Sequence, residues 1–94
     1  MTFRLARFEW DKYNRAELLD HNIQQDEAET IFVGNTYWWK SHIRKGETRY
    51  RVTGKTFEGR FLTLVVTIKV KETLRVITGW DAEDWEIKKW RSRQ

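Results

Sequence analysis

Residues 60–70 read RFLTLVVTIKV, the most apolar and β-branched stretch of this 94-residue chain. Val, Ile, Thr and Phe favour extended backbone, and a run of this kind is typical of a strand that is covered on much of both faces. We therefore predict that residues 60–70 form the middle strand of a sheet and that the rest of the chain is arranged around it.

The segments on either side of this stretch alternate with a period of two. Glycine falls at Lys45-Gly46-Glu47 and at Phe57-Glu58-Gly59, where antiparallel hairpins turn. The pattern predicts strands at about 36–44 and 48–56 before the middle strand, and a further strand at 74–79 after it. A short alternating segment at 3–10 predicts one more strand.

Two helices are predicted before the hairpins. Asp11 can cap a helix that runs to about residue 21, and Asn22 tolerates the left-handed backbone that ends one. A second helix begins after Gln24 and ends near Gly34. The apolar side chains predicted to face inward are Ala16, Leu18 and Leu19 in the first helix and Ala28, Ile31 and Phe32 in the second.

A last helix follows the strands. Asp81 can cap it, and its charges match the helix dipole, with acidic residues in the first turn and basic residues toward the end. Ile87 and Trp90 share one side, whereas Trp85 falls nearly opposite, so Trp85 either faces a partner or is wedged between two layers. The sequence thus predicts a single α+β domain over 1–94, with N-terminal helices and a C-terminal helix packed on a mainly antiparallel sheet.

The composition excludes several classes of protein. The chain has no cysteine, which excludes a disulfide scaffold, and it has no Ser-centred glycine elbow. Its two histidines, His21 and His42, cannot by themselves form a metal site, so we expect neither metal nor cofactor. No segment approaches the roughly 18 apolar residues of a membrane span, and residues 1–10 lack the apolar run of a signal peptide. We therefore expect a cytoplasmic protein that does not bind membranes.

The charge favours an anionic partner. The chain carries a net charge of +4, and alternation places Arg49, Arg51 and Lys55 on one side of their strand. If the polar faces of neighbouring strands coincide, that side carries almost no acids. It would also carry Trp38, Lys40, His42, Arg44 and Arg75. Cations interleaved with aromatic rings suit RNA, although Lys and Arg are also routine on the solvated face of an antiparallel sheet.

Cleavage of RNA needs little apparatus, because its 2′-hydroxyl can serve as the nucleophile. The protein needs only to position the phosphate, stabilise the developing charge and move a proton. Arginines can supply the first two functions, and His42, Glu47 or Glu58 could move the proton. A single histidine on a strand is more often an ordinary surface residue.

Several stretches together resemble a known family. The run FEWD at 8–11, then DHNI at 20–23 and the acidic DEA at 26–28, resembles the FEWD…HGV…EEA opening of the BrnT toxins. The later RY…GKT…GR at 49–60 resembles their hairpin, and RVIT at 75–78 resembles their RIIS strand. These motifs span nearly the whole chain in the right order.

This resemblance implies a fold like that of the RelE ribonucleases and an activity of RNA cleavage. BrnT toxins are metal-independent endoribonucleases of type II toxin–antitoxin systems; they arrest translation until a BrnA-type antitoxin binds, which also implies an oligomer with that partner. Arg49, Arg75 and His42 are the predicted catalytic residues. The predicted RNA-binding residues are Arg51, Lys55, Arg60 and Trp80. Arg51 and His42 come from the face argument alone.

The chain departs from the family at one position. Where BrnT toxins commonly end the RIIS strand with a small residue and an arginine, this chain has Gly79 and Trp80. Tryptophan can stack on a base but cannot neutralise a phosphate. Either neighbouring arginines substitute, or the protein is a weak or retargeted enzyme, or it is a noncatalytic RNA- or protein-binding module of the same fold.

Overall fold

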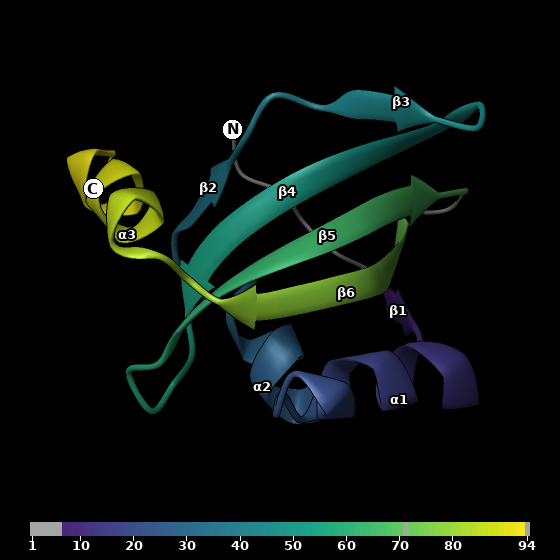
Figure 1. The fold of residues 1–94 in the computed structure, drawn as a ribbon, viewed down its shortest axis with the longest axis horizontal. Coiled ribbons are helices and arrows are strands. Elements are labelled where there is room, and N and C mark those ends of the chain that lie inside the picture. Colours follow the sequence, from purple (N-terminus) through teal and green to yellow (C-terminus); the bar gives the residue numbers. More distant parts are fainter. Residues whose placement is uncertain (1–6, 71, 94) are drawn as a thin grey trace.

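The computed structural model describes residues 7–70 and 72–93. Figure 1 shows a small α+β fold in which the described residues form three helices and a sheet. The elements in chain order are β1 (Arg7–Glu9), α1 (Lys12–Asp20), α2 (Gln25–Thr30), β2 (Thr36–Trp38), β3 (His42–Arg44), β4 (Glu47–Lys55), β5 (Phe61–Lys69), β6 (Thr73–Asp81) and α3 (Asp84–Ser92). Residues 3–6 of the first predicted strand lie outside the described residues.

The sheet has the order β1-β6-β5-β4-β2, and β3 pairs with β4 as a separate extension. β5 is the middle strand, as the 60–70 run predicts. All pairs are antiparallel except β1 with β6, which run parallel. The prediction of a mainly antiparallel sheet is therefore confirmed.

The sheet packs between helices on both sides (Figure 1). We call the side covered by α1 and α2 the core face and the opposite side, part of which α3 covers, the outer face. The core joins apolar side chains of the two N-terminal helices and their connection to those of β4, β5 and β6 and is fully buried. Its members are Leu18, Ile23, Ala28, Ile31, Val52, Leu62, Leu64, Val66, Leu74 and Val76.

Helix α1 begins as predicted but buries different residues. The Asp11 carboxylate accepts hydrogen bonds from the backbone amides of Tyr13 and Asn14, and Asn22 ends the helix region with a φ of 59°. Of the predicted inward side chains only Leu18 is buried, because α1 lies along β6. There Asn14, one turn earlier, donates to the carbonyl of Val76, just beyond the residues of β6 that β1 pairs. Ala16 and Leu19 are exposed.

The predicted strand at 36–44 is broken, and this corrects the predicted position of Trp38. β2 and β3 both pair with β4, but the register shifts by one residue between them, so Trp38 lies opposite Val52 whereas His42 lies opposite Arg49. Trp38 therefore packs on the core face, against Phe32 and Tyr50. The prediction that it shares a face with His42 is wrong.

Strand β6 also contains an irregularity, which decides where Trp80 lies. Val65 and Val66 are adjacent in β5, but their partners in β6 are Thr78 and Val76. The unmatched residue Ile77 is a β-bulge, and a bulge shifts the alternation of side chains by one. Trp80 therefore shares the outer face with Arg75 although five positions separate them.

Helix α3 begins later than predicted. Its N-cap is Glu83, and Asp81, the predicted cap, is the last residue of β6. The helix is anchored through Glu86, which is 1% exposed and accepts a hydrogen bond from the Trp80 indole. Among the described residues, no helix is long and apolar enough to cross a lipid bilayer.

Candidate functional site

The outer face carries a hollow of about 480 Å³ at the end of the sheet away from α3. Arg49 from β4, Lys69 from β5 and Arg75 from β6 contribute to its lining, and the remaining walls come from α1, from the start of β4 and from the bulge in β6. The other lining residues are Tyr13, Asn14, Glu17, Glu47, Ile77 and Thr78. Three neighbouring strands thus each supply one cation to the same concave surface.

Arg75 is held in place by two carboxylates. Its Nη1 donates to Asp11 Oδ2 at 3.0 Å and to Glu9 Oε1 at 3.1 Å. The hydrogen bond to Asp11 raises the pKa of Arg75 above its ordinary value. The backbone amide of Asn14, followed by Arg75, lowers the pKa of Asp11. Arg75 is therefore oriented before any ligand arrives, but its positive charge is partly neutralised by Glu9 and Asp11.

Arg49 is more weakly held. Its Nε donates to Glu47 Oε1 at 3.2 Å, and the Glu47 side chain is 45% exposed, so this pair contributes little to stability. His42 lies directly across from Arg49 in the β3–β4 ladder and is exposed. Cross-strand neighbours have Cβ atoms about 4.5 to 5.5 Å apart, so His42 lies beside Arg49, although it is not among the residues that line the hollow. Of the predicted catalytic residues, the structure brings Arg49 and Arg75 into the hollow.

Acidic residues also surround the hollow, which corrects the expectation that this face carries almost no acids. Glu17 and Glu47 line it, and Glu9 and Asp11 bind Arg75 from behind. The alternation pattern of the strands could not reveal these contacts, because Glu9, Asp11 and Glu17 come from β1 and α1. The cations of the hollow are therefore partly neutralised within the protein.

Glu17 is a candidate proton carrier that the sequence reasoning missed. Its Oε2 accepts a hydrogen bond from the Thr78 hydroxyl at 2.7 Å and lies 3.2 Å from Nε2 of His21. The available signal was the spacing of Glu17 and His21, four residues apart on one helix face. Glu58 lies elsewhere, in a small acidic hollow between α2 and the β4–β5 turn.

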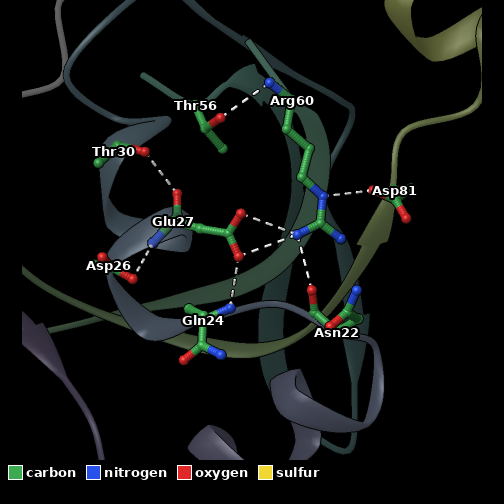
Figure 2. Close-up of polar contacts among 8 residues, drawn as sticks. All are labelled: Asn22, Gln24, Asp26, Glu27, Thr30, Thr56, Arg60 and Asp81. Carbon is green, nitrogen blue, oxygen red and sulfur yellow. Dashed lines mark hydrogen bonds and ion pairs between the residues drawn. The ribbon is translucent and has the colours of Figure 1, made fainter. Parts of the chain in front are cut away.

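Arg60 lies outside this site, in a cluster that joins the helices to the sheet (Figure 2). Its Nη1 donates to the carbonyl of Asn22 at 2.8 Å and to both carboxylate oxygens of Glu27 at 3.1 Å. Its Nε donates to Asp81 at 2.8 Å. The Arg60 guanidinium thus links the α1–α2 connection and α2 to the last residue of β6.

The other predicted RNA-binding residues lie under or beside α3. Trp80 donates to Glu86, which is the geometry of an anchor for α3. The Arg51 guanidinium packs against the rings of both Trp39 and Trp85. Lys55 is exposed, with its Nζ 5.7 Å from the centre of the Phe61 ring. The structure does not bring these residues into the hollow.

The chain matches no protein-family model, and a comparison with curated proteins finds no match. Within the described part of the chain, no three His, Cys, Asp or Glu side chains are grouped so that they could hold a metal ion.

Proposed function

We propose that this protein is a toxin-type endoribonuclease related to the BrnT toxins, with a RelE-like fold, that binds single-stranded RNA in the hollow and cleaves it without a metal. The observation that carries this proposal is the convergence of Arg49, Lys69 and Arg75 from three adjacent strands on one concave surface. A phosphate diester carries its charge on two oxygens, which match such a set of donors.

A buried hydroxyl beside these cations supports the same assignment. Thr67 lies opposite Arg75 in the β5–β6 ladder, and it is 2% exposed. Within residues 7–70 and 72–93 its Oγ1 makes no hydrogen bond. A buried polar atom without a partner costs free energy and calls for an explanation, and a phosphate oxygen that accepts from this hydroxyl, with Arg75 remaining in place, supplies one.

The proposed reaction is transfer of the phosphate to the neighbouring ribose oxygen. The 2′-oxygen attacks phosphorus and the bond to the 5′-oxygen breaks, which leaves a 2′,3′-cyclic phosphate and a 5′-hydroxyl. Arg49 and Lys69 stabilise the charge that develops on the phosphoryl oxygens, and the fixed guanidinium of Arg75 orients the phosphate. Glu47, beside Arg49, takes the proton from the 2′-hydroxyl, and His42, across the ladder from Arg49, donates one to the leaving oxygen.

A second candidate function is RNA binding without cleavage. Arg75 shares its charge with Asp11 and Glu9, and the tryptophan at the position where BrnT toxins carry arginine is tied to Glu86 beneath α3. The hollow therefore lacks the additional cation of the family. Such a protein would bind RNA with an affinity that falls as the salt concentration rises, and it would leave the RNA uncleaved.

The proposal includes a setting in the cell. A BrnT-type toxin acts on RNA in the cytoplasm and forms a complex with a BrnA-type antitoxin that neutralises it. A small reading frame next to this gene, encoding a basic ribbon-helix-helix-like protein, would support this setting. Expression of the chain alone should then slow growth and deplete intact mRNA, whereas normal growth at verified expression would favour the noncatalytic module.

The direct test is cleavage of end-labelled single-stranded RNA by the purified protein in the presence of EDTA. We expect products that end in a cyclic phosphate, and we expect Arg49→Ala to lower the rate by about 100- to 1,000-fold, the usual effect of losing one charge-stabilising donor. Arg91→Ala, which removes an exposed arginine from the last turn of α3, is the matched control and should retain full activity. Binding that Arg49→Ala weakens, without cleavage by the unaltered protein, would identify the noncatalytic module. Absence of binding even at low salt would contradict both candidates.

A further inference from the structure

Three aromatic rings in edge-to-face contact, those of Tyr37, Trp39 and Trp85, form a row beside α3 on the outer face. The rings of Trp39 and Trp85 meet edge to face with their centres 5.2 Å apart, and Tyr37 meets Trp39 in the same manner at 4.7 Å. Trp85 is 51% exposed although it is one of the largest apolar side chains of the chain. An aromatic ring that is fixed at its edge and open on its surface is suited to stacking against another flat group.

The guanidinium of Arg51 packs against this row and forms an ion pair with Glu86. Its Cζ is 4.4 Å from the centre of the Trp39 ring and 5.3 Å from that of Trp85. The nearest carboxylate oxygen, on Glu86, is 3.8 Å from Nε, which is too long for a hydrogen bond. Among the described residues the Arg51 guanidinium makes no hydrogen bond at all, and its Nε is buried without a partner. The two rings and the Glu86 carboxylate therefore hold the guanidinium in place beside the exposed ring of Trp85.

We propose that Trp39, Arg51 and Trp85 form a stacking platform for an unpaired base of single-stranded RNA, on the same outer face as the hollow that takes its phosphate. This inference rests on the proposed function and names the form of RNA that the site accepts. Base stacking on aromatic and guanidinium groups is how proteins hold unpaired RNA, since every base has a flat face. A base in a duplex is already stacked and could not reach the platform.

The position of the platform fits one continuous ligand. Arg51 follows Arg49 by two residues on the same face of β4, a distance of about 6 to 7 Å along a strand. A nucleotide whose phosphate lies at Arg49 therefore has its base within reach of Arg51 and the two rings. On α3, Lys88 and Lys89 are exposed three and four residues after Trp85, so they share its side of the helix and favour an anionic ligand.

The structure thereby moves the stacking role from the residue that the sequence favoured. Trp80 was the predicted platform, but its indole nitrogen donates to the buried Glu86 at 3.2 Å and the ring lies under α3. Trp85, the second residue of α3, has the open surface that Trp80 lacks. Both tryptophans lie at the same end of the outer face. Their different burial assigns Trp80 to anchoring α3 and Trp85 to stacking on a base.

The test compares binding of a short oligouridylate with binding of the same oligonucleotide made abasic, each measured by fluorescence anisotropy at fixed salt. We expect Trp85→Ala to weaken binding of the oligouridylate by about 5- to 150-fold, the range for loss of one stacked base. It should not change binding of the abasic strand, which offers phosphates alone. Trp85→Phe should keep most of the affinity. Phe57→Ala removes a comparably exposed aromatic side chain from the β4–β5 turn and should change neither.

The outcomes separate this inference from the proposed function. Normal binding of both strands by Trp85→Ala would overturn the platform and leave the proposed function intact, as would an equal loss for both strands. No binding of either strand by the unaltered protein would overturn the proposed function and the platform together. A shift from dimer to monomer on Trp85→Ala, with RNA affinity unchanged, would assign the surface to a second copy of the chain and also overturn the platform.

Discussion

Replacement of Arg60 by alanine tests whether this residue stabilises the fold or contacts RNA. The resemblance to BrnT toxins predicts an RNA contact, whereas the structure surrounds the guanidinium with acceptors from the protein itself (Figure 2). Removal of the side chain leaves Glu27, which is 28% exposed, with only the backbone amide of Gln24 as a donor to its carboxylate. The same change frees the carbonyl of Asn22 at the end of α1.

The expected loss of stability follows from the exposure of these partners. A net hydrogen bond to a charged group contributes about 1.5 to 3 kcal/mol when it is shielded. The pair with Asp81, whose side chain is 70% exposed, contributes at most about 1 kcal/mol. Because the pair with Glu27 is partly solvated, we expect Arg60→Ala to lower the free energy of unfolding by about 2 kcal/mol. For a domain of this size that lowers Tm by about 8 to 16 °C.

The measurement combines thermal unfolding, followed by circular dichroism, with RNA affinity of the folded protein at a temperature where each variant is folded. Arg49→Ala is the matched control: its one exposed pair predicts a stability loss of less than about 1 kcal/mol together with a marked loss of RNA affinity. Arg60→Ala should show the opposite pattern. An unchanged Tm with weakened RNA binding would refute the structural role and restore Arg60 to the RNA-binding set.

Three further changes test other parts of the structure. Trp80→Ala should lower the free energy of unfolding by about 2 to 4 kcal/mol in urea denaturation and leave RNA affinity intact, because the ring anchors α3; weakened RNA binding at unchanged stability would instead show that Trp80 stacks on a base. Asp11→Asn should remove a pH-dependent contribution to stability. Because the pKa of Asp11 is depressed below its ordinary value of 3.8, the ionised form contributes stability above that pH and loses it as the pH falls through the lower folded value. The difference in unfolding free energy between the two proteins should therefore be constant near neutral pH and shrink in acid; a difference that grows in acid would contradict this. Gly54→Ala should cost about 1 to 3 kcal/mol, since an added Cβ would lie 2.9 Å from Ile31 Cβ and 3.2 Å from its backbone oxygen, and a variant as stable as the parent would show that α2 can move aside.

Local patterns in the sequence were sufficient to predict the elements of this fold. The apolar run at 60–70 became the middle strand β5, and the glycines at 46 and 59 adopt the positive φ values that the predicted hairpins require. The capping side chain of Asp11 begins α1 as predicted. These features depend on residues close together in the chain, so backbone sterics, hydrogen bonding and burial of one face act on them directly.

The composition of the site was predictable only where strands are regular. Arg49 and Arg75 lie on the same face of the sheet, as predicted. The side chains of β4 and β6 alternate regularly around these two residues, and both line the hollow. Trp38 and Trp80 were misplaced or left open, because a register shift between β2 and β3 and the bulge at Ile77 each change the alternation by one residue. An extra residue of this kind leaves the sequence pattern looking like an ordinary strand.

Contacts between distant segments were decided by the tertiary structure alone. The sequence showed an arginine at 60 and a carboxylate at 27, but only the packing of α2 against the start of β5 joins them in an ion pair. In the same way, β1 and α1 bring Glu9 and Asp11 to Arg75, and α3 brings Trp85 to Arg51. The sequence by itself determined which charged and aromatic side chains the protein has and which strands carry them. Which of those charges are neutralised within the protein, and which remain open to a ligand, depends on how the burial of apolar surface packs the helices onto the sheet, and no local pattern records that packing.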